Sequence, residues 1–190
     1  MTIKNKIYFS AKELSNVYSL VAVGMLLSLR VVLGIFANYS MAMFGNLIKI
    51  HVNFIPIIVA AVLFGPICAG IVGAAGDFLS FFLNSAGQTY FPGMTLNGFL
   101  TGLIFGLFLY KNINKITNII LAWVINVIFV EVLLMALWLN IMNGATYTFY
   151  LGVRFTSEVL IKSIPTILLM VSFCKIATKI KIPDNKKRKL

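Results

Sequence analysis

His51-Val-Asn-Phe-Ile-Pro-Ile-Ile-Val-Ala-Ala-Val-Leu-Phe-Gly-Pro66 runs directly into Ile67-Cys-Ala-Gly-Ile-Val-Gly-Ala-Ala-Gly-Asp77, so that two apolar runs meet at a Gly-Pro corner. As a helix, residues 51–64 would rise about 21 Å, whereas the hydrocarbon core of a bilayer is roughly 30 Å thick. The first run is therefore too short to cross a membrane. A short helix at membrane depth, beside the polar segment Tyr90-Phe-Pro-Gly-Met-Thr-Leu-Asn-Gly98, suggests a cavity rather than a plain lipid anchor.

The composition excludes an ordinary soluble domain. Hydrophobic residues make up 60% of the 190-residue chain, and its mean hydropathy is +0.97. We expect residues 1–190 to form a single integral membrane domain, with residues 1–15 as a cytoplasmic N-terminal segment and residues 179–190 as a basic cytoplasmic tail. The first apolar run begins only near Val17 and no small-residue cleavage site follows it, so no cleavable signal peptide is indicated.

The apolar runs predict an all-α membrane protein with six transmembrane helices. The expected spans are 16–38, 51–64, 67–84, 95–111, 117–142 and 153–178. An even number of spans places both termini on one side of the membrane, and most cations then fall on that side. These cations are Lys4, Lys6, Lys12, Lys111, Lys115, Lys175, Lys179, Lys181 and the run Lys186-Lys-Arg-Lys189. The positive-inside rule makes that side cytoplasmic, so we expect a multi-pass protein of a bacterial cell membrane.

The formal net charge of +11 does not indicate binding of nucleic acid. The cations lie mostly at the chain ends and in one short loop, and they are not interleaved with the aromatic residues of a soluble surface. Cys68 and Cys174 lie inside apolar runs without the spacing of metal ligands or of a disulfide, and His51 is the one histidine. We therefore expect no nucleic-acid partner, no metal and no cofactor.

Small residues recur at helical spacing in three of the spans. One set is Gly98, Gly102 and Gly106, another is Gly70, Gly73 and Gly76, and a third is the pair Gly24 and Ser28. Small residues let helix backbones approach closely in a membrane, where apolar side chains alone give little drive to associate. Packing inside the bundle is favoured for the first set. For the pair in the first span, the sequence leaves open whether it faces the bundle or a partner protein.

Ionisable residues within a span are candidate sites, because a charge in hydrocarbon is costly. Arg30 lies near the outer side of the first span and has no acidic residue one helical turn away. Arg154, Glu158 and Lys162 share one face of the last span, where a mutually satisfied ion ladder is the structural alternative to a ligand site. For Asp77, pairing with a cation or capping of a backbone group is favoured over contact with a ligand.

The outer half of the chain combines a slight cationic excess with many aromatic residues. Arg30, Lys49 and Arg154 carry positive charge there, against the carboxylates of Glu131 and Glu158. The aromatic residues are Tyr39, Phe44, Tyr90, Phe91, Trp138, Tyr147 and Tyr150. Arginine suits bidentate capture of a carboxylate, and aromatic side chains stack on flat rings. If these side chains converge, they fit a flat, anionic, water-soluble ligand better than a cation such as thiamine.

Two blocks of the sequence resemble the substrate-binding S component of an energy-coupling factor (ECF) transporter. The first block is Phe54-Ile-Pro-Ile-Ile-Val-Ala-Ala-Val-Leu-Phe-Gly-Pro66 with Gly70-Ile-Val-Gly-Ala-Ala-Gly-Asp77. The second is Tyr90-Phe-Pro-Gly-Met-Thr-Leu with Gly102-Leu-Ile-Phe-Gly-Leu-Phe-Leu-Tyr110. The resemblance extends over residues 17–175. Folate-type members are the most similar, through Arg30, Leu137-Trp-Leu-Asn140, and Val153-Arg154 followed by Lys162 and Pro165.

The resemblance implies six helices and a vitamin, folate in the first place, held near the outer face under the first and third loops. The substrate-binding residues that we predict on this basis are Arg30, Lys49, Tyr90, Pro92, Gly93, Trp138 and Arg154. In this hypothesis Arg30 and Arg154 hold the ligand carboxylates or the polar edge of its ring. Tyr90 and Trp138 pack the ring, and Lys49 assists electrostatically.

The same resemblance implies protein partners, namely a transmembrane coupling subunit and two ATPase subunits. The family often has an Ala-xxx-Ala pair in its first helix for this coupling, but here Ala22 is followed by Leu26. Gly24 and Ser28 are expected to replace that pair, so we predict a docking face at Ala22, Gly24 and Ser28.

The chain has no Gly-xxxx-Gly-Lys-Ser/Thr motif, and we expect a transport subunit rather than an enzyme. Other readings remain open. In one alternative, this chain belongs to the same family but binds another vitamin, such as pantothenate or riboflavin. An intramembrane enzyme would need a catalytic pair, for which Asp77 and Glu131 are the available acids. A structural membrane protein would bind no small molecule at all.

Overall fold

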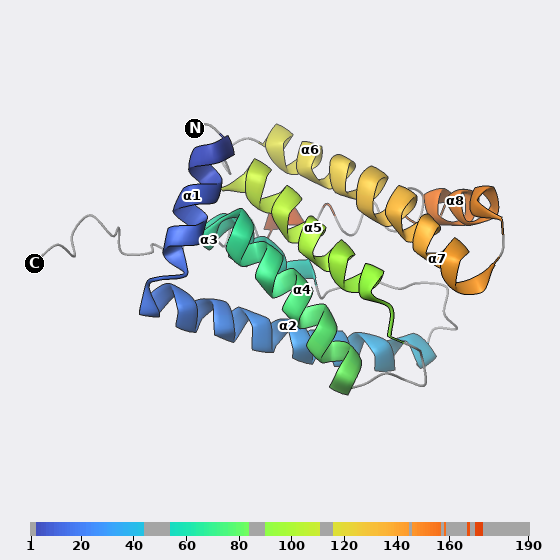
Figure 1. Ribbon diagram of the computed structural model, residues 1–190, viewed down its shortest axis with the longest axis horizontal. Helices are drawn as coiled ribbons and strands as arrows, with labels where there is room; N and C mark the ends of the chain where they lie inside the picture. The colour runs from blue at the N-terminus through green and yellow to red at the C-terminus, as the bar shows by residue number, and fades with distance from the viewer. Residues whose placement is uncertain are drawn as a thin grey trace, which may run out of the picture.

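The fold was analysed in a computed structural model that describes residues 3–43, 54–83, 90–110, 116–144, 146–156, 158, 167 and 170–172. Every regular element in these ranges is helical. In chain order they are α1 (Ile3–Glu13), α2 (Val17–Met43), α3 (Ile55–Phe64), α4 (Pro66–Leu83), α5 (Pro92–Leu109), α6 (Ile116–Asn126), the π-helical segment η2 (Val127–Leu134), α7 (Met135–Asn143) and α8 (Tyr147–Phe155). Figure 1 shows α6, η2 and α7 as one rod beside α5.

Four helices of the described part are long and apolar enough to cross a membrane. They are Val17–Ile35, Pro66–Leu83, Pro92–Leu109 and Thr117–Met142. Each matches one of the six predicted spans. The predicted second span is the short apolar helix α3, which has 10 residues. Most of the predicted sixth span, 153–178, lies outside the described residues, and α8 begins before it at Tyr147.

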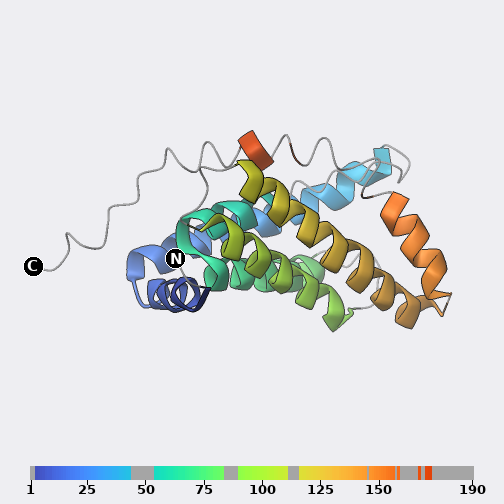
Figure 2. The same cartoon turned by 90° about the horizontal axis from the view of Figure 1, so that it is seen from above.

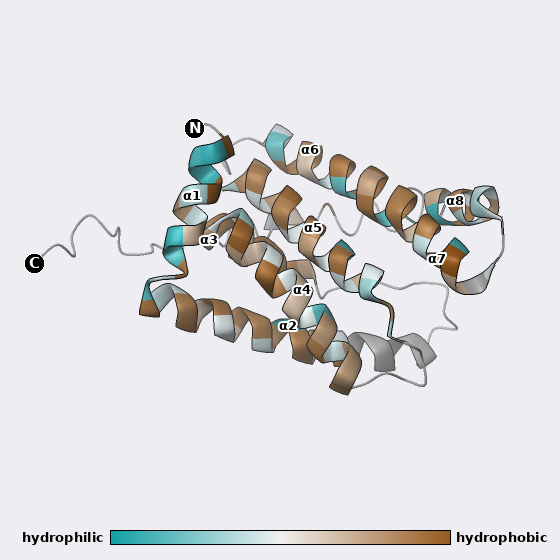
Figure 3. Ribbon diagram, in the orientation of Figure 1, coloured by the Kyte–Doolittle hydropathy of each residue, from teal (hydrophilic) through white to brown (hydrophobic). Residues whose placement is uncertain are grey.

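Apolar residues line the spanning helices, whereas polar residues gather on α1 (Figure 3). Large apolar side chains stay exposed on α2 and on the rod of α6 and α7, among them Leu20, Val21, Phe129 and Ile141. Exposed apolar side chains on helices of this length are expected where the helices face lipid. The all-α membrane architecture predicted from the sequence is thus observed.

The corner between α3 and α4 is made by Gly65 and Pro66. Gly65 has a φ of +89°, which side chains rarely permit, and its N–H donates to the Ala60 carbonyl at 3.2 Å. Pro66 is the first residue of α4, where its missing N–H costs nothing. Helix α3 ends here after 10 residues, which is too short to span the bilayer. Its buried side chains, such as Ile58 and Phe64, pack in the core.

Helices α4 and α5 pack along a seam of glycines. A Cβ atom added to Gly73 would strike the carbonyl of Gly98, and one added to Gly102 would strike the backbone of Ala69. Gly106 lies in the same way against Pro66. The prediction that the Gly98, Gly102 and Gly106 set packs inside the bundle is therefore confirmed.

The N-terminal segment forms a helix, α1, for which the sequence suggested no regular element. It runs across one end of the bundle, transverse to α4 and α5, as two perpendicular views show (Figures 1 and 2). We refer to this end as the α1 end. The other end, where α4 finishes and α5 begins, is called the Tyr90 end.

Candidate ligand-binding site

Arg30 is buried between α2 and α4, with only 5% of its surface exposed. It lies directly over Gly76: a Cβ atom at that position would be 2.5 Å from Arg30 Nε. The guanidinium fits only because position 76 has no side chain. Its Nη1 atom is fully buried and has no hydrogen-bond partner among the residues that the structure describes. A buried donor of this kind is costly, and it can bind an acceptor strongly.

Asp77 is the carboxylate whose charge acts on Arg30. Thr95 Oγ1 donates a hydrogen bond to Asp77 Oδ2 at 3.3 Å, and the Tyr90 hydroxyl lies 2.9 Å from the same Thr95 oxygen. A polar chain of hydrogen bonds therefore links α4 to the start of α5, and the charge of Arg30 on α2 acts on its Asp77 end. The charge of Arg30 acts on Asp77, and the expectation that Asp77 pairs with a cation or caps a backbone group stays a prediction.

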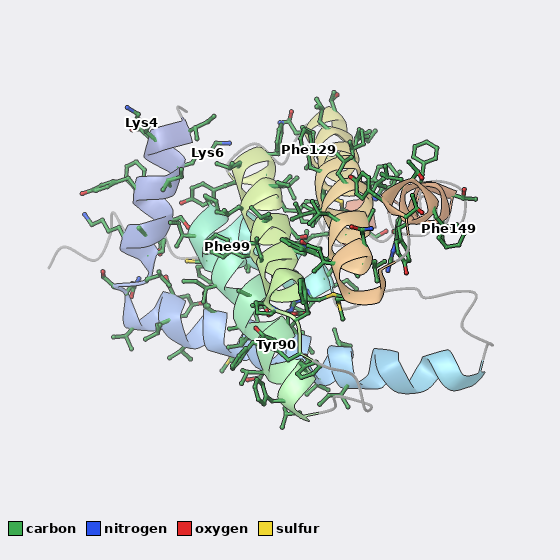
Figure 4. The ribbon with its side chains drawn as sticks, turned by 45° about the vertical axis from the view of Figure 1, so that its right-hand side comes forward. Lys4, Lys6, Tyr90, Phe99, Phe129 and Phe149 are labelled. Carbon is green, nitrogen blue, oxygen red and sulfur yellow. The ribbon has the colours of Figure 1, made fainter. Side chains whose placement is uncertain are left out.

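The ring of Tyr90 packs against the last two turns of α4. Its centroid lies 5.6 Å from that of Phe78, 5.2 Å from that of Phe81 and 6.0 Å from that of Phe82. Figure 4 shows Tyr90 where the α4 and α5 ribbons meet. These contacts hold the ring on α4 while the hydroxyl points to Thr95, so Tyr90 joins the polar chain through its oxygen.

A second group of side chains links α5 to α7. Trp138 Nε1 donates to Asn97 Oδ1 at 3.0 Å, and the Trp138 ring lies 5.4 Å from that of Phe91. Gly93 is buried beneath Trp138, because an added Cβ atom would lie 2.6 Å from Trp138 Cδ2. The structure therefore brings two predicted residues, Gly93 and Trp138, into direct contact. Pro92 lies beside them, exposed, and starts α5.

The other predicted residues lie apart or outside the described part. Arg154 is on α8 and forms an ion pair with Glu158, with a nitrogen–oxygen distance of 3.8 Å. This pair is the part of the expected ion ladder that can be seen, since Lys162 lies outside the described residues. Lys49 and His51 lie outside them too.

Two residues near the predicted site were missed from the sequence: Thr95 and Asn97. Thr95 and Asn97 lie in the first turns of an otherwise apolar helix, where polar residues need partners. That signal was available before the structure. Their partners Asp77 and Trp138 are 18 and 41 residues away, so no local pattern identified them.

The π-helical segment η2 lies in the middle of the rod formed by α6 and α7. It carries Glu131, and it follows Asn126, whose Oδ1 atom is buried without a partner in the described part of the chain. Such π-helical turns occur frequently at functional sites. In the described part of the chain, no three histidine, cysteine, aspartate or glutamate residues lie close enough together to hold a metal ion.

Three similarities to known proteins accompany this geometry. A family model described as "ECF transporter, substrate-specific component" matches residues 18–180. The folate transporter FolT of Clostridium novyi (strain NT) is 32% identical over 123 residues, which are 65% of this chain and 71% of that protein. A crystal structure of FolT bound with folic acid matches with a TM-score of 0.67 at 30% identity, covering 88% of this chain and 96% of that one.

Proposed function

Because the chain belongs to the family of ECF-transporter substrate-specific components, as its sequence resemblance had suggested, we propose that it captures folate for uptake across the membrane. The observation that carries this proposal is the match over most of both chains to FolT with folic acid bound. The ligand is expected at the Tyr90 end of the bundle, where most of the described candidate residues gather.

The side chains of the Tyr90 end suit the chemistry of folate, which joins a flat pterin ring to a benzoyl group and an anionic glutamate. Arg30 has a buried donor without a partner in the described part, and a carboxylate or a polar ring edge is the acceptor that a guanidinium binds best. The rings of Phe91 and Trp138 offer an aromatic surface for a flat ring.

Other residues of the proposed site support these contacts. Asn97 holds Trp138 in one orientation, and Gly93 provides the space beneath its ring. Tyr90 and Thr95 fix the Asp77 carboxylate, which balances part of the Arg30 charge. This support matters because a site of fixed geometry avoids the entropic cost of ordering side chains when ligand binds.

We include Lys49, Pro92 and Arg154 in the proposed site on the basis of the sequence. Arg154 already pairs with Glu158, so a ligand carboxylate would have to compete with that partner.

We further propose a coupling subunit and two ATPase subunits as partners, with docking at Ala22, Gly24 and Ser28 on α2. Among the residues that the structure describes, an added Cβ atom at Gly24 meets nothing within 4 Å, and Ser28 Oγ donates to the Gly24 carbonyl of its own helix. These two residues are exposed, whereas Ala22 packs partly against the core. Gly24 and Ser28 would therefore make the closest contact. The membrane is proposed to be a bacterial plasma membrane, with six spans and both termini on its cytoplasmic side.

Tryptophan quenching by folate, pantothenate, riboflavin and thiamine tests the capture role in the purified, detergent-solubilised chain. We expect tight, stoichiometric quenching by folate only. Trp138→Phe should remove most of the signal, whereas the matched variant Trp123→Phe should keep it, because Trp123 packs against the core. Binding of a different vitamin would overturn the choice of folate. A folded sample that binds none of the four would contradict the capture role itself.

A further inference from the structure

The face of α1 that meets the bundle is polar. Lys6 is 4% exposed and Ser10 is fully buried. Lys6 Nζ donates to the Leu107 carbonyl at 2.7 Å, in the last turn of α5. Ser10 Oγ accepts from the Ile67 N–H at 3.0 Å, in the first turn of α4. Both partners are backbone groups of the kind that helix ends leave unpaired, so α1 caps two spanning helices at once.

These polar contacts fix the rotation of α1 about its own axis. The turn that follows is also held, because Ser19 Oγ donates to Glu13 Oε2 at 2.6 Å. With Lys6 and Ser10 pointing inward, the other faces of the helix point outward. In Figure 4 the Lys6 side chain extends toward α5 and that of Lys4 extends away from the bundle.

The outward faces of α1 carry large apolar side chains together with lysines. Ile3 is 61% exposed and Tyr8 is 66% exposed, and Ile7 and Phe9 are exposed as well. Lys4 and Lys12 are also exposed, four residues to either side of Tyr8, so these three form one ridge along the helix. A helix in water would show the opposite arrangement, with its apolar side chains turned inward.

The exposed apolar surface continues from α1 into the lipid-facing side of α2. Val17, Tyr18 and Val21 are exposed immediately after the short turn that joins the two helices. Helix α1 runs across the end of the bundle while α2 runs along it, so α1 is level with the end of a spanning helix (Figures 1 and 2). In a membrane, that end enters the headgroup layer. Tyrosine and lysine are the side chains typical of that layer.

We propose that α1 lies in the headgroup layer of the membrane and that its ridge of Lys4, Tyr8 and Lys12 binds the phosphates of anionic phospholipids. Ile3 and Ile7 then reach toward the acyl chains, as in other interfacial helices. The charges favour lipid over a protein partner: the ridge is cationic, and Glu13, the one acid of α1, is already bonded to Ser19. The inference concerns the α1 end alone and does not depend on which vitamin is bound.

Hydrogen exchange of the full chain in nanodiscs tests this proposal. Amides of residues 3–13 should exchange about 5- to 30-fold more slowly in phosphatidylcholine containing phosphatidylglycerol than in phosphatidylcholine alone, because each lysine near an anionic surface contributes about 1 kcal/mol. The double variant Lys4→Gln/Lys12→Gln should lose this difference. Lys186→Gln/Lys187→Gln removes the same charge from the tail and should keep it.

The proposal would be overturned if the amides of residues 3–13 exchanged at equal rates in the two lipids. It would also be overturned if both double variants lost the difference between the lipids to the same extent. Slowing that requires an added coupling subunit instead of anionic lipid would make α1 a protein-docking helix, which also overturns it. The wild-type chain provides a check that needs no variant. Raising the salt concentration screens exposed charges, so the slowing should shrink, and slowing that is insensitive to salt would contradict a role for the lysines.

Discussion

The two ends of the bundle bury polar side chains in opposite ways. At the α1 end, Lys6 and Ser10 bond to backbone groups of α5 and α4, so the buried polar atoms hold helices together. At the Tyr90 end, Arg30 is buried as deeply, but its Nη1 atom has no partner in the described part of the chain. Both ends border the same pair of helices, α4 and α5. The difference fits the proposed function, in which the α1 end provides stability and the Tyr90 end binds ligand at a cost in stability.

The two buried cations, Lys6 and Arg30, differ in what their burial costs the stability of the fold. A buried charge whose hydrogen bonds are all satisfied contributes to the fold, whereas a buried donor without a partner costs about 1–3 kcal/mol. Burial alone lowers the pKa of Lys6 below its usual 10.5, yet the bond to the Leu107 carbonyl compensates for part of its desolvation. For Arg30 the compensation within the described chain is limited to the charge of Asp77.

Both ends depend on the glycine seam, so breaking the seam should have the largest effect. Gly102→Leu would force the α5 backbone away from Ala69 and should destabilise the fold by about 3 kcal/mol. Thermal unfolding in detergent measures the loss. Gly24→Leu is the matched control, because no atom of the described residues lies within 4 Å of a Cβ atom there. Equal losses in the two variants would show that the seam is not where the packing is tight.

Exchanging a buried cation for methionine at each end tests the comparison directly. Arg30→Met should weaken folate binding about 10- to 100-fold and change the unfolding temperature only slightly, because the loss of an unpaired buried donor offsets the loss of the charge that acts on Asp77. Lys6→Met should do the reverse, with unchanged affinity and a lower unfolding temperature. Ligand titration and thermal unfolding of both variants measure the pair of effects. A large loss of stability in Arg30→Met would mean that Arg30 is a structural residue.

Alkaline pH should weaken the α1 end through Tyr110. Burial, and then the charge of Glu13, raises the pKa of this phenol from 10.0 to about 12. The phenol of the unfolded chain ionises near pH 10, so between about pH 10 and 12 ionisation favours the unfolded state and stability falls. Tyr110→Phe should remove up to about 2 kcal/mol of that loss. The test compares unfolding temperatures of both proteins at pH 9 and pH 11, and parallel declines would contradict it.

The smallest expected effect is the loss of the cap that α1 provides for α4. Ser10→Ala leaves the N–H groups of Ile67 and Cys68 without their acceptor and should cost about 1 kcal/mol in unfolding free energy. Ser28→Ala is the control, because Ser28 is exposed and its hydroxyl donates to the Gly24 carbonyl within its own helix. If both variants unfold alike, the capping contact contributes nothing measurable.

Sequence reasoning predicted the membrane class and the family. Arg30 was proposed as a site residue because a lone charge in an apolar run requires a reason, Gly93 and Trp138 were proposed from the family resemblance, and these site assignments stay predictions. The sequence did not reveal α1, because its inward face is polar and its outward face apolar, the reverse of the usual pattern. It also missed Thr95 and Asn97, and the predictions for Lys49, Lys162 and Cys174 stay predictions.

The sequence by itself determined what depends on local order along the chain: which segments are apolar enough to span, where Gly65 and Pro66 end a helix, and which glycines share a face. Only the tertiary structure decided which side chains meet. Lys6 reaches a carbonyl 101 residues away, and Trp138 reaches Asn97 across 41 residues. Such contacts depend on how helices pack in space, and periodicity within one helix does not specify its neighbour.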